Sequence, residues 1–175
     1  MNTTFADSSN AGAPTVAYHQ GTAFWLTGLP ASGKSTLAQS LQHTLRERGR
    51  VAVLIDSDDF RELITPDPSY DDAERDRFYF VLGEVCGHVA RGGADVVIAA
   101  TGSKRVYRDW LRGRLEHFVE ILLEADPQIL RGRDVKGLYA AAAQGDAPSL
   151  PGAGVPYEQP QHPEITLDTG KLDAQ

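Results

Sequence analysis

Short apolar runs punctuated by glycine recur along the chain, and their composition is typical of buried strands. The run at 51–55 (VAVLI) is continuously apolar, as expected of a parallel strand that is covered on both faces of a sheet. We predict strands at residues 23–27, 51–55, 94–99 and 118–123.

The segments between these runs have the three- to four-residue apolar spacing of amphipathic helices. The longest has an apolar face formed by Phe78, Leu82, Val85 and Val89. Helices are predicted at residues 35–48, 71–91 and 104–114. Strands that alternate with helices imply crossover connections and an open, mostly parallel sheet, so we expect an α/β fold with three layers. Residues 140–156, rich in Ala, Gly and Pro, are predicted to form a long functional loop.

Composition and charge narrow the classes of function. The length of 175 residues suits one domain, and we expect it at residues 21–175, after a flexible, polar tail at 1–20. A net charge of −7 at pH 7 argues against a binder of nucleic acid or of anionic membranes, because such proteins need a basic surface. The single cysteine, Cys86, cannot form an internal disulfide, which favours the reducing cytoplasm.

Residues 28–35 (GLPASGKS) match the phosphate-binding pattern G-x-x-x-x-G-K-[ST], between a predicted strand and a predicted helix. In such a loop, backbone N–H groups and the helix N-terminus surround phosphate oxygens. The lysine, Lys34, reaches the β- and γ-phosphates, and the Ser35 hydroxyl is a ligand of Mg²⁺. We therefore predict a nucleoside triphosphate site, with ATP and Mg²⁺ as cofactors, on Gly28, Leu29, Pro30, Ala31, Ser32, Gly33, Lys34, Ser35 and Thr36.

Three aspartates follow the second predicted strand, in the order Asp56-Ser57-Asp58-Asp59. Ligands in open parallel sheets bind beyond the carboxyl ends of strands, so these carboxylates should face the phosphates. Asp56 is a candidate Mg²⁺ ligand beside Ser35, and Asp58 is a candidate base for an acceptor hydroxyl, which makes Lys34, Asp56 and Asp58 the predicted catalytic residues. Alternatively, Asp58 or Asp59 only caps the following helix. The short spacing in sequence from Lys34 to these aspartates favours a small-molecule kinase.

Several separated motifs resemble those of the adenylyl-sulfate (APS) kinase family, over roughly residues 22–170. They are WLTGLPASGKSTL at 25–37, IDSDDFR at 55–61, GEV at 83–85, RDVKGLY at 133–139, and PYEQP at 156–160 with Pro163-Glu164. The resemblance implies a P-loop NTPase-type fold and a homodimer. It also implies transfer of the γ-phosphate of ATP to the 3′-hydroxyl of adenylyl sulfate, giving PAPS.

The resemblance also implies roles for individual residues. Asp56 and Asp58 match an aspartate pair that works with Mg²⁺ and the acceptor hydroxyl, and Tyr70 falls where the family packs an aromatic ring on the substrate adenine. A lid that closes over ATP begins at Arg133 and extends to about residue 157, with Arg133 and Lys136 on the ATP side. The family's arginines near the substrate correspond to Arg61, Arg75 and Arg105.

The chain departs from the family mostly on the acceptor side. The family's DRxENIRR reads ERDRFYFV at 74–81, so that Phe78 replaces a substrate-binding asparagine and two arginines are missing. SPYR reads GSKR at 102–105, the lid's KKAR reads AAAA at 140–143, and KxFTG reads PSLPG at 148–152, which removes a lysine and the second ring of the adenine sandwich. Leu150 or Tyr79 could restore part of the stacking, and Lys104 or Arg77 part of the charge.

Two interpretations of the acceptor site therefore stay open at this point. The chain is either a divergent APS kinase with a rebuilt acceptor site or a kinase of the same architecture for another, less anionic hydroxyl compound. A third possibility, an inactive nucleotide-sensing module, is disfavoured by the intact phosphate loop and aspartates. In either kinase, the predicted acceptor-binding residues are Asp58, Arg61, Tyr70, Arg75, Phe78, Lys104, Arg105 and Leu150.

Overall fold

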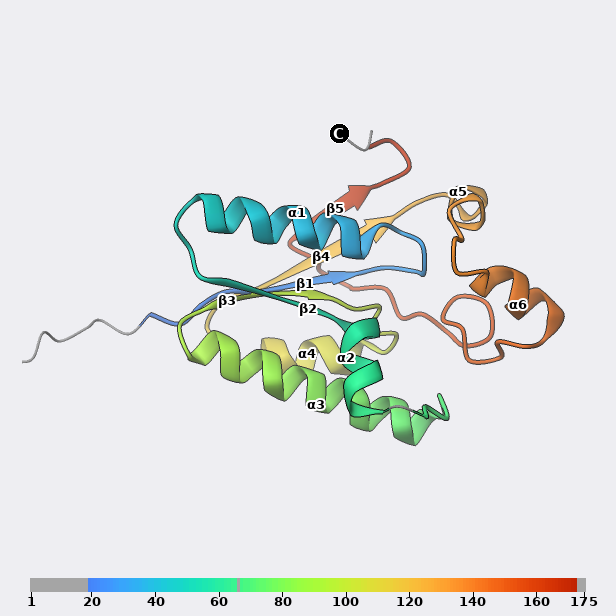
Figure 1. Ribbon diagram of the computed structural model, residues 1–175, viewed down its shortest axis with the longest axis horizontal. Coiled ribbons are helices and arrows are strands. Elements are labelled where there is room, and N and C mark those ends of the chain that lie inside the picture. The colour runs from blue at the N-terminus through green and yellow to red at the C-terminus, as the bar shows by residue number, and fades with distance from the viewer. Residues whose placement is uncertain (1–18, 66, 173–175) are drawn as a thin grey trace, which may run out of the picture.

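The computed structural model describes residues 19–65 and 67–172, so that the predicted tail at 1–20 lies almost wholly outside the described residues. The described residues form a five-stranded sheet flanked by helices (Figure 1). The strands are β1 (Ala23–Thr27), β2 (Ala52–Asp56), β3 (Asp95–Ala99), β4 (Phe118–Glu124) and β5 (Ile165–Asp168). The helices are α1 (Lys34–Glu47), α2 (Ser57–Ile64), α3 (Asp72–Arg91), α4 (Arg105–Arg112), α5 (Pro127–Gly132) and α6 (Leu138–Gln144).

All neighbouring strands of this sheet run parallel, in the order β2-β3-β1-β4-β5. Parallel neighbours need crossover connections, and the helices between the strands supply them. The carboxyl ends of the strands consequently lie at one edge of the sheet, on the right of Figure 1, where α2, α5 and α6 also lie. The predicted α/β fold with an open parallel sheet is confirmed.

Two apolar layers hold the helices against the sheet. Successive strand residues point to opposite faces, so Trp25 and Leu26 belong to different layers. Trp25 and Ile98 pack with Leu82 of α3 and with residues of α4, and all three of these side chains are fully buried. Leu26 packs with Ala38 of α1 on the other face. The sheet is therefore the middle of three layers (Figure 1).

The position of β2 differs from the expectation of burial on both faces. β2 is an edge strand that pairs only with β3, and its residues 53–56 are only half-buried. A continuous apolar run indicates a strand in a parallel sheet, but it does not encode the order of the strands. The order depends on which side of β1 each crossover returns to.

The buried face of α3 is also rotated from the predicted one. Phe78 and Leu82 are buried as predicted, but Val85 and Val89 are only partly buried, and Cys86 takes a central position in the core. Glycines permit this rotation, because a Cβ at Gly83 would lie 3.0 Å from the Trp110 ring of α4. The spacing of the large apolar side chains alone therefore predicts the wrong buried face for α3.

Three elements, β5, α5 and α6, were not predicted, and α2 was expected only as the helix after the aspartates, without a range. Helix α6 occupies the first part of the predicted loop at 140–156. β5 is short and mostly exposed, and α6 (LYAAAAQ) has no amphipathic pattern that would reveal a helix. Within residues 19–65 and 67–172, no helix is both long and apolar enough to cross a membrane.

Candidate functional site

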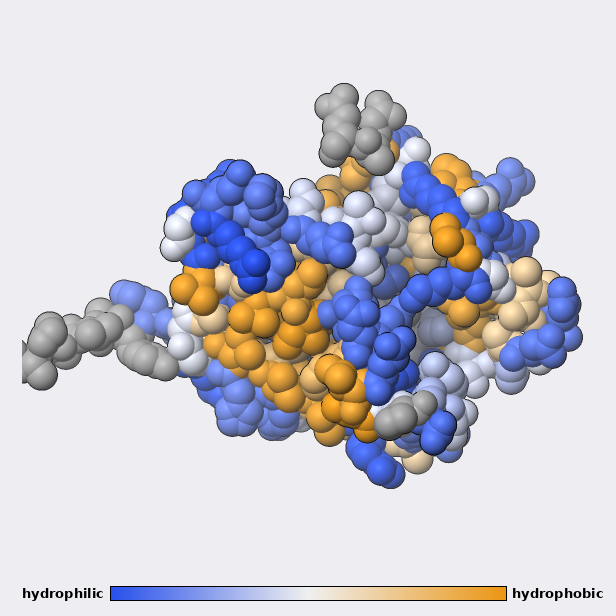
Figure 2. Space-filling view, viewed as in Figure 1, coloured by the Kyte–Doolittle hydropathy of each residue, from blue (hydrophilic) through white to orange (hydrophobic). Residues whose placement is uncertain are grey.

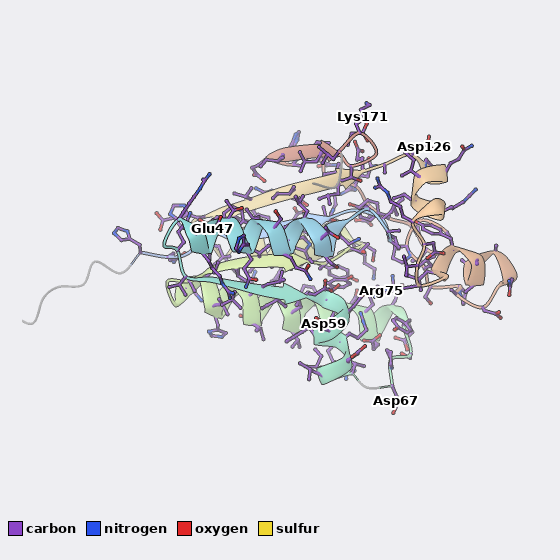
Figure 3. The ribbon with its side chains drawn as sticks, turned by 45° about the horizontal axis from the view of Figure 1, so that its top comes forward. Glu47, Asp59, Asp67, Arg75, Asp126 and Lys171 are labelled. Carbon is purple, nitrogen blue, oxygen red and sulfur yellow. The ribbon has the colours of Figure 1, made fainter. Side chains whose placement is uncertain are left out.

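A cavity of about 1010 Å³ opens at the carboxyl edge of the sheet. Its walls come from the phosphate loop, α2, the first half of α3, and residues 133–138 and 146–151. Figure 3 shows Arg75 reaching this end of the sheet from α3. The predicted site residues that line the cavity are Pro30, Ala31, Gly33, Lys34, Ser35, Thr36, Asp56, Asp58, Arg61, Tyr70, Arg75, Phe78, Arg133, Lys136 and Leu150.

The loop between β1 and α1 has the backbone geometry of a phosphate cradle. Gly28 packs so closely on β4 that a Cβ there would lie 2.4 Å from the carbonyl oxygen of Leu123. Gly33 precedes α1 in the left-handed conformation (φ 87°) and offers no side-chain cap. The first N–H groups of α1 are therefore available to an anion at the positive end of the helix. Leu29 and Ser32 do not line the cavity. The backbone N–H of Ser32 donates to the carbonyl oxygen of Leu29 and so helps to fix the turn of the loop.

The Nζ atom of Lys34 lies within this loop, where it donates to the carbonyl oxygens of Gly28 at 3.0 Å and Leu29 at 2.9 Å. Burial lowers the pKa of Lys34 from 10.5 to about 8, although the carboxylates of Asp58 and Asp56 oppose this shift. The ammonium is thus charged at neutral pH, and anionic phosphates would stabilise that charge.

Ser35 and Asp56 form a pair of oxygen groups at the mouth of the loop. The Ser35 hydroxyl donates to Oδ2 of Asp56 at 2.5 Å, and Oδ1 of Asp56 accepts from the backbone N–H of Asp58 at 2.9 Å. Asp56 is therefore the N-cap of α2. The alternative interpretation, in which Asp58 or Asp59 is the cap, is wrong because α2 starts directly after β2 and leaves the capping position to Asp56.

The same pair fits a magnesium ion. Hydroxyl and carboxylate oxygens are the ligands that Mg²⁺ prefers, and Mg²⁺ commonly takes one or two of them from the protein and the rest from phosphates and water. Within the described part of the chain, no group of three His, Cys, Asp or Glu side chains could hold a metal ion. With one hydroxyl and one carboxylate, Ser35 and Asp56 suit an ion that takes its remaining ligands from a nucleotide and water.

Two predicted ATP-site cations lie on the segment after α5. Lys136 donates from Nζ to Oδ2 of Asp58 at 2.5 Å, and this hydrogen bond raises the pKa of Lys136. Arg133 donates from Nη2 to the carbonyl oxygen of Thr169 at 3.0 Å. Both side chains line the cavity, so this segment adds positive charge opposite the phosphate loop.

Asp134 and Tyr139 of the same motif have structural contacts that the sequence did not reveal. The Asp134 carboxylate accepts from the N–H groups of Leu138 at 2.8 Å and Tyr139 at 2.7 Å, which fixes the start of α6. The Tyr139 hydroxyl donates to the carbonyl oxygen of Pro30 at 3.1 Å. Residues 133–139 are thereby fastened to the phosphate loop, which gives Asp134 and Tyr139 of this motif a structural role.

On the acceptor side of the cavity, the positive charge of Arg61 is balanced by a carboxylate. Arg61 forms an ion pair with Glu74. Its guanidinium lies 3.7 Å from the centroid of the Phe78 ring and 5.2 Å from that of Tyr70. Because Glu74 balances the charge and Arg61 covers Phe78, this ring forms a wall of the cavity rather than an open stacking surface.

Arg75 differs from Arg61 because its partners are neutral. It is only 6% exposed and donates to the carbonyl oxygens of Ser149 at 2.8 Å and Tyr70 at 3.4 Å, and to the Ser103 hydroxyl at 3.4 Å. No carboxylate among the described residues forms an ion pair with it. A buried guanidinium without a counter-charge is well suited to an anionic ligand.

Two predicted acceptor-binding residues do not line this cavity. Lys104 forms ion pairs with Asp76 at 2.8 Å and Asp72 at 3.6 Å along α3. Arg105 donates to the carbonyl oxygen of Gln159 at 3.3 Å and lines a separate cavity of about 270 Å³ beside α4. Ser103 faces Arg75. Because α4 begins at Arg105, the side chains of Lys104 and Arg105 do not follow Ser103 to that side of the loop.

Comparison with known proteins assigns this arrangement to a family. The family model for adenylylsulphate kinase matches residues 20–168. This chain belongs to that family. The adenylyl-sulfate kinase of Rippkaea orientalis is 37% identical over 150 residues, which cover 86% of this chain and 83% of that protein. A probable bifunctional SAT/APS kinase of Sorangium cellulosum is 37% identical over 147 residues, which cover 84% of this chain but only 25% of that longer protein.

A solved structure extends the match to three dimensions. The APS kinase of Mycobacterium tuberculosis, solved in complex with AMPPNP and APS, has a TM-score of 0.80 to this chain at 30% identity, covering 86% of this chain and 89% of that one. The predicted resemblance to the adenylyl-sulfate kinase family and the predicted P-loop fold are thus confirmed.

Proposed function

We propose that this protein is an ATP-dependent kinase that phosphorylates the 3′-hydroxyl of adenylyl sulfate and releases PAPS and ADP. The observation that carries this proposal is the convergence, in one cavity of an adenylyl-sulfate kinase family member, of the phosphate loop, Asp58 and the uncompensated Arg75. Adenylyl sulfate is an anionic nucleotide with a free hydroxyl. Arg75 suits its anionic group and Asp58 suits its hydroxyl.

The residues of the cavity divide the work of an in-line phosphoryl transfer. Lys34 and the N–H groups at the start of α1 bind the triphosphate and stabilise the charge that develops on it. Asp58 accepts the proton of the attacking hydroxyl. The Mg²⁺ ion that Ser35 and Asp56 would hold neutralises phosphate charge when it is bound.

The segment at 133–157 is proposed to act as a lid over the nucleotide. Lys136 and Tyr139 already contact α2 and the phosphate loop, respectively, and Arg75 joins α3 to the backbone of Ser149. A covered cavity excludes water, which would otherwise compete with the acceptor for the γ-phosphate.

The alternative kinase for a less anionic alcohol has no contact in its favour, because Arg75 retains an unbalanced positive charge on the acceptor side. The inactive module is disfavoured by the geometry of Lys34, Ser35 and Asp56 described above.

The first experiment measures ADP release from Mg-ATP with adenylyl sulfate, beside a panel of hydroxylated amino acids, nucleosides and sugars. We expect turnover at micromolar adenylyl sulfate, formation of PAPS by chromatography, and loss of both in EDTA. Lys34→Ala is the control and should abolish transfer. Negligible turnover of adenylyl sulfate together with a clear response to another alcohol would overturn the proposed acceptor.

We further propose a homodimer located in the cytoplasm. Figure 2 shows apolar surface gathered over the β2 edge of the sheet, between α1 and α3. Exposed apolar side chains of the neighbouring segments include Val51, which precedes β2, Leu63 of α2 and Val81 of α3. A second copy of the chain would cover such a surface. The buried, unpaired Cys86 fits a reducing compartment. Light scattering of wild type and Leu63→Asp tests the dimer, which the variant should weaken.

A further inference from the structure

Tyr79 of α3 places a phenol hydroxyl on the acceptor side of the cavity. Its side chain lines the cavity and is only 7% exposed. The hydroxyl accepts a hydrogen bond from the backbone N–H of Gly102 at 3.1 Å. This contact places the oxygen at the loop after β3, one residue along the chain before Ser103, whose hydroxyl accepts from Arg75.

The ring of Tyr79 is held in place from two sides. It stacks on Tyr107 of α4 with centroids 4.5 Å apart and an interplanar angle of 16°, and it meets the edge of Phe78 at 5.2 Å. Tyr107 therefore covers one face of the ring. The hydroxyl consequently has a fixed position, so a hydrogen bond from it would require little ordering.

The hydrogen-bonding capacity of this hydroxyl is only half used. A tyrosine hydroxyl both accepts and donates. Gly102 uses the oxygen as an acceptor, and within residues 19–65 and 67–172 no group accepts the hydroxyl hydrogen. Burial raises the pKa of Tyr79, so the hydrogen is retained at neutral pH, and the charges of Arg61, Arg75 and Asp58 all act on the hydroxyl.

We propose that Tyr79 is a specificity-determining residue that donates its free hydroxyl hydrogen to an oxygen of the acceptor held between Arg75 and Asp58. The inference rests on the proposed function, since the acceptor is taken to be adenylyl sulfate. A buried donor without a protein partner favours a ligand that offers an oxygen at this point, and it disfavours a ligand that is apolar there.

Tyr79→Phe tests the proposal because it removes the hydroxyl and keeps the stacked ring. One neutral hydrogen bond corresponds to about a three- to tenfold change in affinity. We expect the KM for adenylyl sulfate to rise by that factor, while kcat and the KM for ATP stay within twofold of wild type. Tyr107→Phe is the matched control, because the Tyr107 hydroxyl donates to Asp76 at 2.5 Å and Tyr107 does not line the cavity. This control should leave all three constants within twofold.

Three outcomes would overturn the inference. The first is an unchanged KM for adenylyl sulfate in Tyr79→Phe. The second is a parallel rise in both KM values, which would indicate a displaced loop at Gly102 rather than a lost substrate contact. The third is an equal effect of Tyr107→Phe. If wild type itself does not phosphorylate adenylyl sulfate, the proposed function fails, and the inference fails with it.

Discussion

Lys136 and Asp58 form a direct ion pair in the wall of the cavity, with Nζ of the lysine 2.5 Å from Oδ2 of the aspartate. The two residues are 78 positions apart in the sequence and belong to the proposed lid and to α2. Asp58 thus has a cation as its partner where the proposed mechanism requires the acceptor hydroxyl. Nucleotide phosphates attract the same cation, so ATP binding would leave Asp58 free for the acceptor.

Replacing Lys136 should impair ATP binding more than folding. We expect Lys136→Met to raise the KM for ATP about tenfold or more, because one charge-assisted hydrogen bond is lost. The thermal midpoint should change little, since both partners are about two-thirds exposed and such ion pairs contribute about 0–1 kcal/mol. Lys171→Met, which removes an exposed lysine paired with Asp168, is the control and should leave the KM for ATP within twofold. An unchanged KM in Lys136→Met would exclude Lys136 from the ATP site.

Asp58 should matter for turnover rather than for nucleotide affinity. General-base catalysis contributes about 10²–10⁴-fold, so we expect Asp58→Asn to lower kcat by that order while the Kd for ATP changes less than threefold. Steady-state kinetics and calorimetric titration with ATP measure the two quantities. Comparable losses in kcat and ATP affinity would contradict the assignment of Asp58 as the base.

The lowered pKa of Lys34 predicts a pH dependence of ATP binding. At pH 7 and below, Lys34 is mostly protonated and the affinity should be nearly constant with respect to this group. Phosphates favour the charged lysine, so the pKa in the complex is higher and binding above pH 8 must take up a proton. The Kd for ATP should then rise by up to about tenfold per pH unit.

Calorimetric titration between pH 7 and 9.5, in buffers with different ionisation enthalpies, measures both the Kd and the proton uptake. Lys34→Arg is the matched control because arginine does not titrate in this range. A wild-type affinity that stays constant up to pH 9.5 would contradict the prediction.

The buried ion pair between Arg108 of α4 and Glu120 of β4 should contribute strongly to the free energy of unfolding. Arg108 and Glu120 are 1% and 5% exposed, with Nε to Oε1 at 2.5 Å. Arg108 also donates to the carbonyl oxygens of Gly102 and Glu158. Glu120→Gln should lower the free energy of unfolding by about 3 kcal/mol or more, since it leaves a buried guanidinium without its counter-charge.

Denaturant unfolding measures this change. Glu124→Gln, an exposed position on the same strand, is the control and should stay within about 0.5 kcal/mol of wild type. Arg112 also contacts Glu120 and is itself a cation, so it cannot replace the lost negative charge. A loss below 1 kcal/mol in Glu120→Gln would therefore contradict the prediction.

Local patterns allowed the phosphate loop and most of the fold to be predicted. Gly28, Gly33 and Lys34 are recognisable because the loop and its helix are contiguous in sequence. Strands β1 to β4 and the helices α1, α3 and α4 follow from apolar periodicity. Helix α6 escaped prediction because four consecutive alanines carry no periodicity.

The acceptor side depended on packing that no local pattern records. Arg75 and Arg105 were both expected near the substrate, yet of these two only Arg75 lines the cavity, because Arg105 begins α4 and lines a separate cavity beside it. The partners of Arg61, Asp58 and Tyr79 likewise come from other elements of the fold.

The chemistry of this protein can thus be read from the amino-acid sequence, as a triphosphate loop followed by carboxylates at the end of the next strand. The packing of the elements, in contrast, sets which cations face the acceptor, which are balanced by carboxylates, and where a spare hydrogen-bond donor lies. The physical reason is the range of the interactions. Backbone turns and periodic burial act over a few residues, whereas charge compensation depends on side chains that meet only after the helices have packed on the sheet.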